Sequence, residues 1–314
     1  MSKVQLETQM RCAYAAMQHL RYGRSLIEIA EELGISRFKV ARMVKEARNL
    51  GLVEVRLHVP DHVDTEMSYA LARRFGLRSA VVVATSVDEP VAVREQLGRV
   101  GARVVAEAVH EDDVVGVTPG RTIAELCQAI TQFPTCDLVQ VTGVAATDWE
   151  KGMQGIMSLG ALAGSLYPLH GPFVTTDESS ARVIASQPSV ARSLRKLEHL
   201  DKAVLSIGGW PDGSLLATQL EELGELRSLR ERVVGEIGTT LLDADGQVVD
   251  AIQGRVIGIT TEQLAAIPVR MGVAGGPGKR KAVRAALRSG LIDVLVTDVR
   301  TARYAMEGPG RIGP

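Results

Sequence analysis

A chain of 314 residues exceeds the usual size of a single hydrophobic core, so its length predicts two domains. Hydrophobic residues make up 46% and charged residues 23%, which is typical of a globular protein and excludes a disordered one. The N-terminus has no apolar signal region and no apolar run reaches the roughly 20 residues of a membrane span, so we expect a cytoplasmic protein with no membrane partner.

Charge distribution and cysteine content restrict the kinds of partner and cofactor that the chain is expected to bind. Residues 1–60 hold ten Lys or Arg against six Asp or Glu, whereas the whole chain has a net charge of −1, so the remainder is acidic. This asymmetry predicts that only the first part meets a polyanion. Cys12, Cys127 and Cys136 form no CxxC pair, and the six histidines form no metal-binding motif, so we expect no metal and no cofactor.

The first 50 residues have the pattern of three short helices. Residues 10–23 supply a first helix, and a second carries apolar Leu26, Ile27, Ile29, Ala30 and Leu33 on one side and ends at Gly34. Ser36 is well suited to cap a third helix. Its buried stripe is expected at Val40, Met43, Val44 and Ala47.

The third helix directs its cations outward, mostly from its first turns, as a recognition helix does toward the major groove of DNA. A two-helix corner with a solvated basic face is the alternative. The spacing of Ala30, Gly34 and Val40 favours a helix-turn-helix. Residues 52–59 alternate like a short wing strand. We expect base contacts from Arg37, Phe38 and Arg42, and phosphate contacts from Ser36, Lys39 and Lys45.

Beyond a helix expected over residues 61–75, strands and helices alternate. The near-continuous apolar runs indicate strands buried on both faces, and therefore a parallel sheet covered by helices. The expected strands are SAVVVAT, DDVVGVTPG, CDLVQVTGV, GPFVTT, KAVLSIGG, VIGIT, RMGVAGG and DVLVTD.

Two of the expected strands are followed by a glycine-containing turn and then by a helix with a cation at its start. Backbone amides at such turns favour an anion, so the two turns together predict a phosphate-bearing ligand. A single glycine-rich turn of this kind often only connects a strand to a helix and binds no ligand. Neither turn matches a nucleotide motif. The residues of the two turns are Thr118, Gly120, Arg121 and Thr122, and Gly275, Gly276 and Lys279.

Other conspicuous residues have structural explanations. Asp243, Asp245 and Gly246 are expected in a turn rather than a metal site. His170, beside a predicted strand end, is interpreted as a surface or packing residue. Trp149 and Trp210 are expected either to cover a ligand or to seal a subunit interface.

The chain resembles SorC/DeoR-type bacterial transcriptional regulators over nearly its whole length. In these proteins a helix-turn-helix head precedes a Rossmann-like α/β sugar-binding domain related to sugar-phosphate isomerases. The matching segments are EIAEELGISRFKVARMVKEARNLGLVEV, LARRFGLRSAVVV, VVGVTPGRTI, LVQVTGV, VVGEIGTTLLDADGQVV, GVAGGPGKRKAVRAAL and DVLVTDVRTARYAM.

The resemblance implies a DNA-binding domain over residues 1–60 and an effector and oligomerisation domain over residues 61–314. It implies a phosphorylated sugar or polyol effector, operator DNA as partner, and a homo-oligomer, dimer or tetramer. It places the two glycine turns at the ligand, and Glu236 where an acidic residue commonly meets sugar hydroxyls. Two departures are Pro119 in the first turn and Thr142, which stands where some relatives have a Schiff-base lysine, so we expect no Schiff base.

The resulting hypothesis is a non-enzymatic regulator of a carbohydrate or polyol operon whose operator affinity responds to the effector. The alternative is a sugar-phosphate isomerase or deaminase with an appended DNA-binding head, in which Glu236 and Lys279 would act as an acid–base pair. No acid-rich or histidine-bearing catalytic loop is present in the sequence, so regulation is favoured.

Overall fold

A computed structural model of the chain describes residues 6–54, 62–144, 149–308 and 310. It divides into two compact units, residues 1–59 and 60–314. Each unit has a hydrophobic core of its own.

The first unit consists of three helices, of which the second and third match the expected start and stop signals. The first begins four residues before the expected range 10–23 and ends three residues before the end of that range. Ser25 and Glu28 form a capping box at the second helix, which ends at Gly34 with φ +64°. Ser36 caps the third, its hydroxyl accepting from the backbone N–H of Lys39 at 3.3 Å. The helices are α1 (Leu6–Leu20), α2 (Leu26–Leu33) and α3 (Arg37–Asn49).

The core of this unit lies where the helices meet. Buried Ala15, Ile29, Val40 and Val44 form it, as the periodicity predicts. The expectation for Ile27 is wrong: it is 54% exposed, because position 27 lies about 100° around α2 from the centre of the stripe formed by Leu26, Ile29, Ala30 and Leu33. Residues 53 and 54 form no strand, and the rest of the expected wing lies outside the described residues.

The second unit is built on a parallel sheet with strand order β1-β9-β8-β5-β2-β3-β4. An antiparallel hairpin, β6 and β7, extends from the end of β5. The strands are β1 (Ser79–Val83), β2 (Val114–Val117), β3 (Cys136–Gln140), β4 (Gly164–Tyr167), β5 (Lys202–Gly209), β6 (Gly235–Ile237), β7 (Thr240–Leu242), β8 (Val269–Val273) and β9 (Val294–Asp298).

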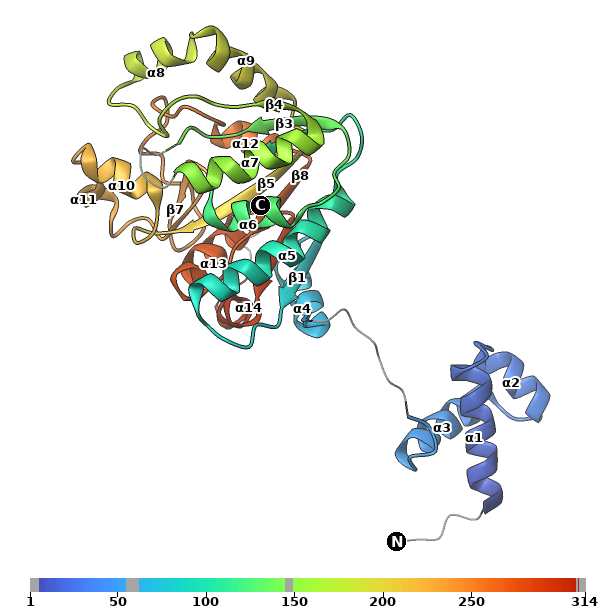
Figure 1. Cartoon of the computed structure of the whole chain (residues 1–314). Coiled ribbons are helices and arrows are strands. Elements are labelled where there is room, and N and C mark those ends of the chain that lie inside the picture. The colour runs from blue at the N-terminus through green and yellow to red at the C-terminus, as the bar shows by residue number, and fades with distance from the viewer. Residues whose placement is uncertain (1–5, 55–61, 145–148, 309, 311–314) are drawn as a thin grey trace. The chain divides into compact units, whose positions relative to one another are not determined.

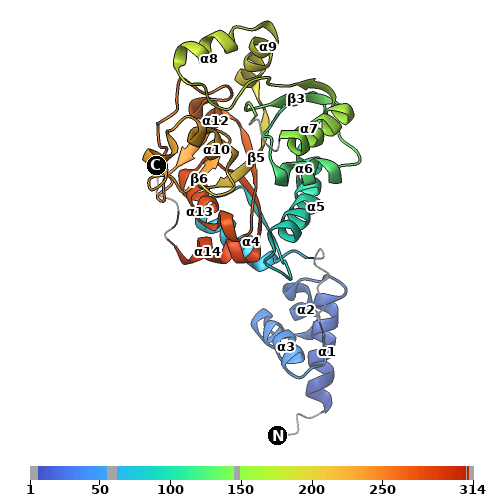
Figure 2. The same ribbon diagram turned by 60° about the vertical axis from the view of Figure 1, so that its left-hand side comes forward.

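Helices cover both faces of this sheet, as Figures 1 and 2 show. Side chains from α5, α6 and α7 form the core on one face, and side chains from α4, α12, α13 and α14 form the core on the other. The helices are α4 (Thr65–Phe75), α5 (Pro90–Ala108), α6 (Arg121–Ala129), α7 (Trp149–Ala163), α8 (Glu178–Ala185), α9 (Pro188–Lys196), α10 (Leu215–Glu222), α11 (Leu226–Leu229), α12 (Thr261–Ala266), α13 (Arg280–Ser289) and α14 (Val299–Glu307), with short 3-10 turns η1 (Leu197–His199) and η2 (Pro277–Lys279).

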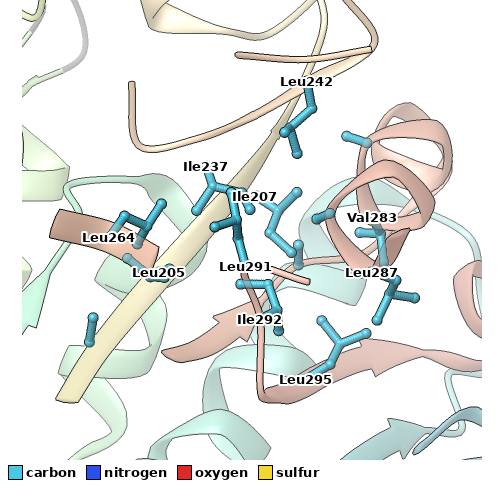
Figure 3. Close-up of a cluster of buried hydrophobic side chains, with 14 of the residues drawn as sticks. Leu205, Ile207, Ile237, Leu242, Leu264, Val283, Leu287, Leu291, Ile292 and Leu295 are labelled. Carbon is cyan, nitrogen blue, oxygen red and sulfur yellow. The ribbon is translucent and has the colours of Figure 1, made fainter. Parts of the chain in front are cut away.

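The prediction of an α/β unit with a helix-covered parallel sheet is confirmed. Strand β5 buries residues on both faces, and Figure 3 shows one of these faces, where Leu205 lies beside Leu264 of α12. Burial on both sides explains why the central strands read as continuous apolar runs. In the described part of the chain, no helix combines the length and apolarity that a membrane crossing needs.

Three expected elements are wrong in detail. GPFVTT and VIGIT are not sheet strands, since their residues form only isolated bridges, such as Val174 with Val256. The edge strand is instead β4, which carries two exposed residues and was not predicted. The helix expected over residues 61–75 begins at Thr65, because Val63 bridges to Val83 and Asp64 caps the helix.

The acidic pair after β7 forms a turn, as expected. The N–H of Gly246 donates to the carbonyl of Asp243 at 3.1 Å, and Gly246 has φ +80°. Asp243 also accepts from the N–H groups of Asp245 and Gln247. No group of three metal-ligating side chains occurs among the described residues.

Candidate functional site

A cavity of about 220 Å³ opens at the carboxyl ends of the central strands. This edge of a parallel sheet is the usual ligand position. Its walls come from the loops after β2, β5 and β8 and from the β6–β7 hairpin. All eight residues expected at the ligand line it: Thr118, Gly120, Arg121, Thr122, Glu236, Gly275, Gly276 and Lys279.

The first loop is held by hydrogen bonds between β2 and β5. The hydroxyl of Thr118 accepts from the N–H of Ser206 at 2.7 Å. The N–H of Thr118 donates to the carbonyl of Val204 at 3.1 Å. Helix α6 then begins at Arg121, whose guanidinium donates to the carbonyl of Gly213 at 3.4 Å. A cation and a helix N-terminus therefore face the cavity together.

The second loop is held by a buried carboxylate at the end of β9. Asp298 is fully buried and accepts from the N–H of Gly276 at 2.7 Å. A Cβ on Gly275 would lie 2.4 Å from the same oxygen, so only glycine fits there. The Gly276 N–H thus serves the loop itself, which removes one of the amides expected to meet an anion.

Loss of this carboxylate is expected to loosen the loop. Asp298 also accepts from the N–H groups of Arg300 and Thr301 and from the Thr301 hydroxyl. Asp298→Asn would place an amide N–H group next to buried N–H and O–H donors that need an acceptor. We therefore expect the free energy of unfolding to fall by about 2 kcal/mol. Asp245→Asn, at a mostly exposed side chain, should cost less than about 1 kcal/mol in the same denaturant titration. Equal losses would contradict the role given to Asp298.

Lys279 supplies the central charge of the cavity. Burial lowers the pKa of its ammonium group to about 8, and repulsion from Arg121 and Arg94 acts in the same direction. Three cations, Lys279, Arg121 and Arg94, thus line one cavity. A bound anion would relieve this repulsion, so the arrangement favours an anionic ligand group.

Glu236 faces the cavity from the hairpin. Burial raises the pKa of its carboxyl group to about 8, although a hydrogen bond from Ser214 and the charge of Lys279 oppose the change. The Ser214 hydroxyl donates to Oε2 of Glu236 at 2.8 Å. A Cβ on Gly208 would lie 2.5 Å from Oε1, so the paired glycine makes room for the carboxyl. At pH 7 Glu236 is mostly protonated and can donate to a ligand oxygen.

Several lining residues escaped the sequence analysis. Thr142 was noted only as a departure, yet its buried hydroxyl lines the cavity and has no hydrogen-bond partner within the described structure. An orphaned buried hydroxyl is best explained by a ligand or water. Arg94 gave no local signal because it lies inside α5. The small residues at the end of β5 did give a signal in the sequence, because small and polar residues at strand ends are typical of ligand sites. The missed lining residues include Arg94, Phe173, Ser206, Gly208, Gly209 and Asp212.

The remaining candidates lie elsewhere. His170 is exposed and does not line the cavity, which agrees with its interpretation as a surface residue. Trp210 packs at the edge of a hydrophobic cluster around Leu216 and Leu220 rather than lining the cavity. The Trp149 side chain lies outside the described part of the structure.

The first unit presents a basic surface on α3. Phe38, Arg42 and Lys45 are spaced by four and three residues, so they share one exposed face opposite buried Val40 and Val44. The remaining predicted cations, Arg37 and Lys39, are exposed on its flanks. These six predicted residues, Ser36, Arg37, Phe38, Lys39, Arg42 and Lys45, are called the α3 surface below.

An aromatic side chain stands at the start of this surface. Phe38 is 68% exposed, and the Arg37 guanidinium lies over its ring at 4.8 Å from the centroid. Such a stack stiffens both side chains while leaving them exposed. The Ser36 hydroxyl caps the helix but can still donate its proton. The α3 surface can therefore offer charge, apolar contact and hydrogen bonds together.

Comparison with known sequences gives a consistent set of relatives. The family described as "Putative sugar-binding domain" matches residues 61–307. The deoxyribonucleoside regulator of Bacillus subtilis is 28% identical over 308 residues, covering 95% of this chain and 97% of that protein. The transcriptional regulator LsrR of an Enterobacter species is 29% identical over 285 residues, covering 89% and 87%.

Solved structures share the fold. The full-length sorbitol operon regulator SorC of Klebsiella pneumoniae superposes with a TM-score of 0.68 at 22% identity, covering 95% of this chain and 98% of that one. A DeoR family transcriptional regulator of Listeria monocytogenes gives a TM-score of 0.65 at 25% identity, covering 76% and 98%.

Proposed function

The chain belongs to the SorC/DeoR-type family of bacterial transcriptional regulators with a sugar-binding domain, and on this basis we propose that it regulates a carbohydrate or polyol operon in response to a phosphorylated sugar-type effector. The observation that carries the effector class is the convergence of Lys279, Arg121 and Arg94 on one cavity that also holds a protonated acid. Three cations suit a phosphate dianion, whereas an uncharged sugar would leave them unneutralised.

In this proposal residues 61–314 form the effector and oligomerisation domain, related to sugar-phosphate isomerases. The phosphate lies beside Lys279 and Arg121. The sugar hydroxyls meet Glu236 and the orphaned hydroxyl of Thr142, which together offer hydrogen-bond donors and acceptors in the same cavity. Thr142 has no amine, so binding at that position is non-covalent.

Residues 1–60 form the DNA-binding domain, a winged helix-turn-helix in which α3 is the recognition helix. Its first turns carry Arg37, Phe38 and Arg42, which we assign to base edges, because a recognition helix enters the major groove by its N-terminal part. Arginine pairs bidentately with guanine, and phenylalanine suits the thymine methyl group. Ser36, Lys39 and Lys45 are assigned to phosphates.

The two functions are coupled through a homo-oligomer acting in the cytoplasm. An effector that binds one quaternary arrangement better than another shifts the population toward it. Because two recognition helices must match two half-sites at a fixed spacing, this shift changes the affinity for operator DNA.

One observation favours an enzyme instead, since Glu236 and Lys279 line the same cavity and both have a pKa of about 8. The two groups are nevertheless poorly prepared for isomerisation. Glu236 is mostly protonated at pH 7, so only a small fraction of it is available as a general base, and the cavity lining in the described residues contains no histidine. We therefore propose that the cavity binds its ligand without converting it.

A thermal-shift screen tests the effector class. We expect phosphorylated sugars or polyols to raise the melting temperature of the purified full chain, because a ligand that binds only the native state stabilises it by mass action. The matched controls are the same sugars without phosphate and inorganic phosphate alone. Stabilisation by the free sugars to the same extent would contradict the anion site. Conversion of a stabilising ligand, followed by NMR, would favour the enzyme.

A further inference from the structure

Helix α1 carries two apolar stripes, and only one is used inside its own unit. Cys12 and Ala16 pack with Ala47 of α3. Ala15 packs with Ile29 and Val40. This stripe is made of small side chains and is fully buried, so it accounts for the three-helix core.

The second stripe consists of four large side chains that remain exposed and the smaller, half-buried Ala13. Their spacings of four, three, four and three residues are those of a helix that packs along a partner helix. Leu6 is 71% and Met10 64% exposed, and Met17 and Leu20 are each 38% exposed. The stripe, called the α1 seam below, is Leu6, Met10, Ala13, Met17 and Leu20.

The charges beside the α1 seam indicate the orientation of a partner. Glu7 and Arg21 are fourteen residues apart, two heptads, and so flank the same side of the seam at opposite ends. Arg21 continues the last turn, its N–H donating to the carbonyl of Met17 at 3.0 Å. In two parallel copies the flanks that carry Glu7 and Arg21 lie on opposite sides of the interface, so these charges would form no pair. Two antiparallel copies set Glu7 of each opposite Arg21 of the other.

We propose that α1 pairs antiparallel with α1 of a second copy of this chain along the α1 seam. A two-fold axis passes near Ala13, whose small side chain permits close approach of the two helices. Leu6 of each copy then covers Leu20 of the other. The interface is isologous, so the same patch serves both copies. It goes beyond the proposed function by assigning a self-association surface to the DNA-binding unit, and it needs neither effector nor operator to form.

Cysteine cross-linking of the full chain tests the pairing and its orientation. The native Cys12, Cys127 and Cys136 are buried, so the background should be low. Separately tagged Leu6→Cys and Leu20→Cys chains are mixed, allowed to exchange and oxidised with copper phenanthroline. We expect a mixed disulfide dimer, and little dimer from either variant alone. Arg11→Cys, exposed on α1 but off the seam, is the matched control and should give no dimer with Leu20→Cys.

A charge swap then tests the flanking pair. In an Ala13→Cys background, Glu7→Arg is expected to lower the disulfide yield at least fivefold, and Glu7→Arg with Arg21→Glu to restore it. A Leu6→Cys dimer stronger than the mixed dimer would overturn the antiparallel orientation. Absence of intermolecular disulfides from all seam positions would overturn the pairing. Neither result depends on the effector screen, so failure of this inference and failure of the proposed function are distinguishable.

Discussion

Replacing Lys279 with methionine is expected to weaken binding of a phosphorylated sugar by roughly 30- to 150-fold, because a hydrogen bond to a charged group contributes about 2–3 kcal/mol at a partly buried site. Methionine keeps the apolar stem, and removing a cation that Arg121 and Arg94 repel relieves that repulsion, so the free protein should not be destabilised. Isothermal titration of the effector found by thermal shift measures the change.

Lys281→Met is the matched control, since Lys281 lies two residues further on and is exposed. Its affinity for the same ligand should stay within about twofold of the wild type. Operator affinity without effector should be unchanged in both variants. If the Lys279→Met chain still binds the phosphorylated ligand normally, the anion does not bind at this loop.

The affinity measured in the same titration is expected to depend on pH. Raising the pH from 7 to 9 passes through the pKa of about 8 of both groups, so Lys279 loses its positive charge and Glu236 gains a negative one. Both changes weaken anion binding. The ligand phosphate is already a dianion because its second pKa is about 6. We expect affinity to fall by about tenfold or more in the wild type. The fall should be smaller in Lys279→Met, where only Glu236 titrates.

The position of the cavity was predictable because local sequence patterns identify the parallel strands, and the carboxyl ends of parallel strands lie at one edge of the sheet. Runs such as DVLVTD are long, apolar and buried on both faces, so they indicate parallel strands. Parallel strands bring their carboxyl ends to one edge, which is why the loops at Thr118 and Gly275 could be expected together. The resemblance to known regulators added Glu236, for which the local pattern gave no signal.

The missed residues depend on packing that no local pattern encodes. Arg94 lies inside α5 and resembles any surface cation of an amphipathic helix, and only the path of α5 across the sheet brings it to the cavity. GPFVTT and VIGIT have strand composition but lie beside the sheet, where they form single bridges instead of ladders. Strand β4 is short and half exposed, so it lacks the apolar run that identifies its neighbours.

The α1 seam shows why apolar periodicity alone is ambiguous. Leu6, Met10 and Met17 would be taken for core residues by spacing, yet they are exposed, and smaller side chains on the adjacent stripe fill the core. An exposed apolar stripe of this regularity is better explained by association than by chance. Sequence spacing therefore finds the stripe, while only the fold shows that it is unused within its own unit.

The double substitution Arg37→Ala and Arg42→Ala is expected to remove specific operator binding. Each arginine that pairs with a base contributes about 1–3 kcal/mol of discrimination, so losing two should lower specific affinity by roughly 30-fold to about 25,000-fold, toward the non-specific level. Both side chains are exposed, so folding should be unchanged. Fluorescence anisotropy with operator and scrambled duplexes measures the ratio of the two affinities.

Lys45→Ala separates base reading from charge. Lys45 is exposed on the same face of α3 as Arg42 but is assigned to a phosphate, so its loss should weaken operator and scrambled DNA alike and reduce the salt dependence by about one phosphate contact. Arg42→Ala should instead lower the ratio of operator to scrambled affinity. Because one charge is removed in each case, electrostatics alone predicts equal effects. A specificity ratio unchanged by Arg42→Ala would contradict the assignment of α3 as the helix that reads the bases.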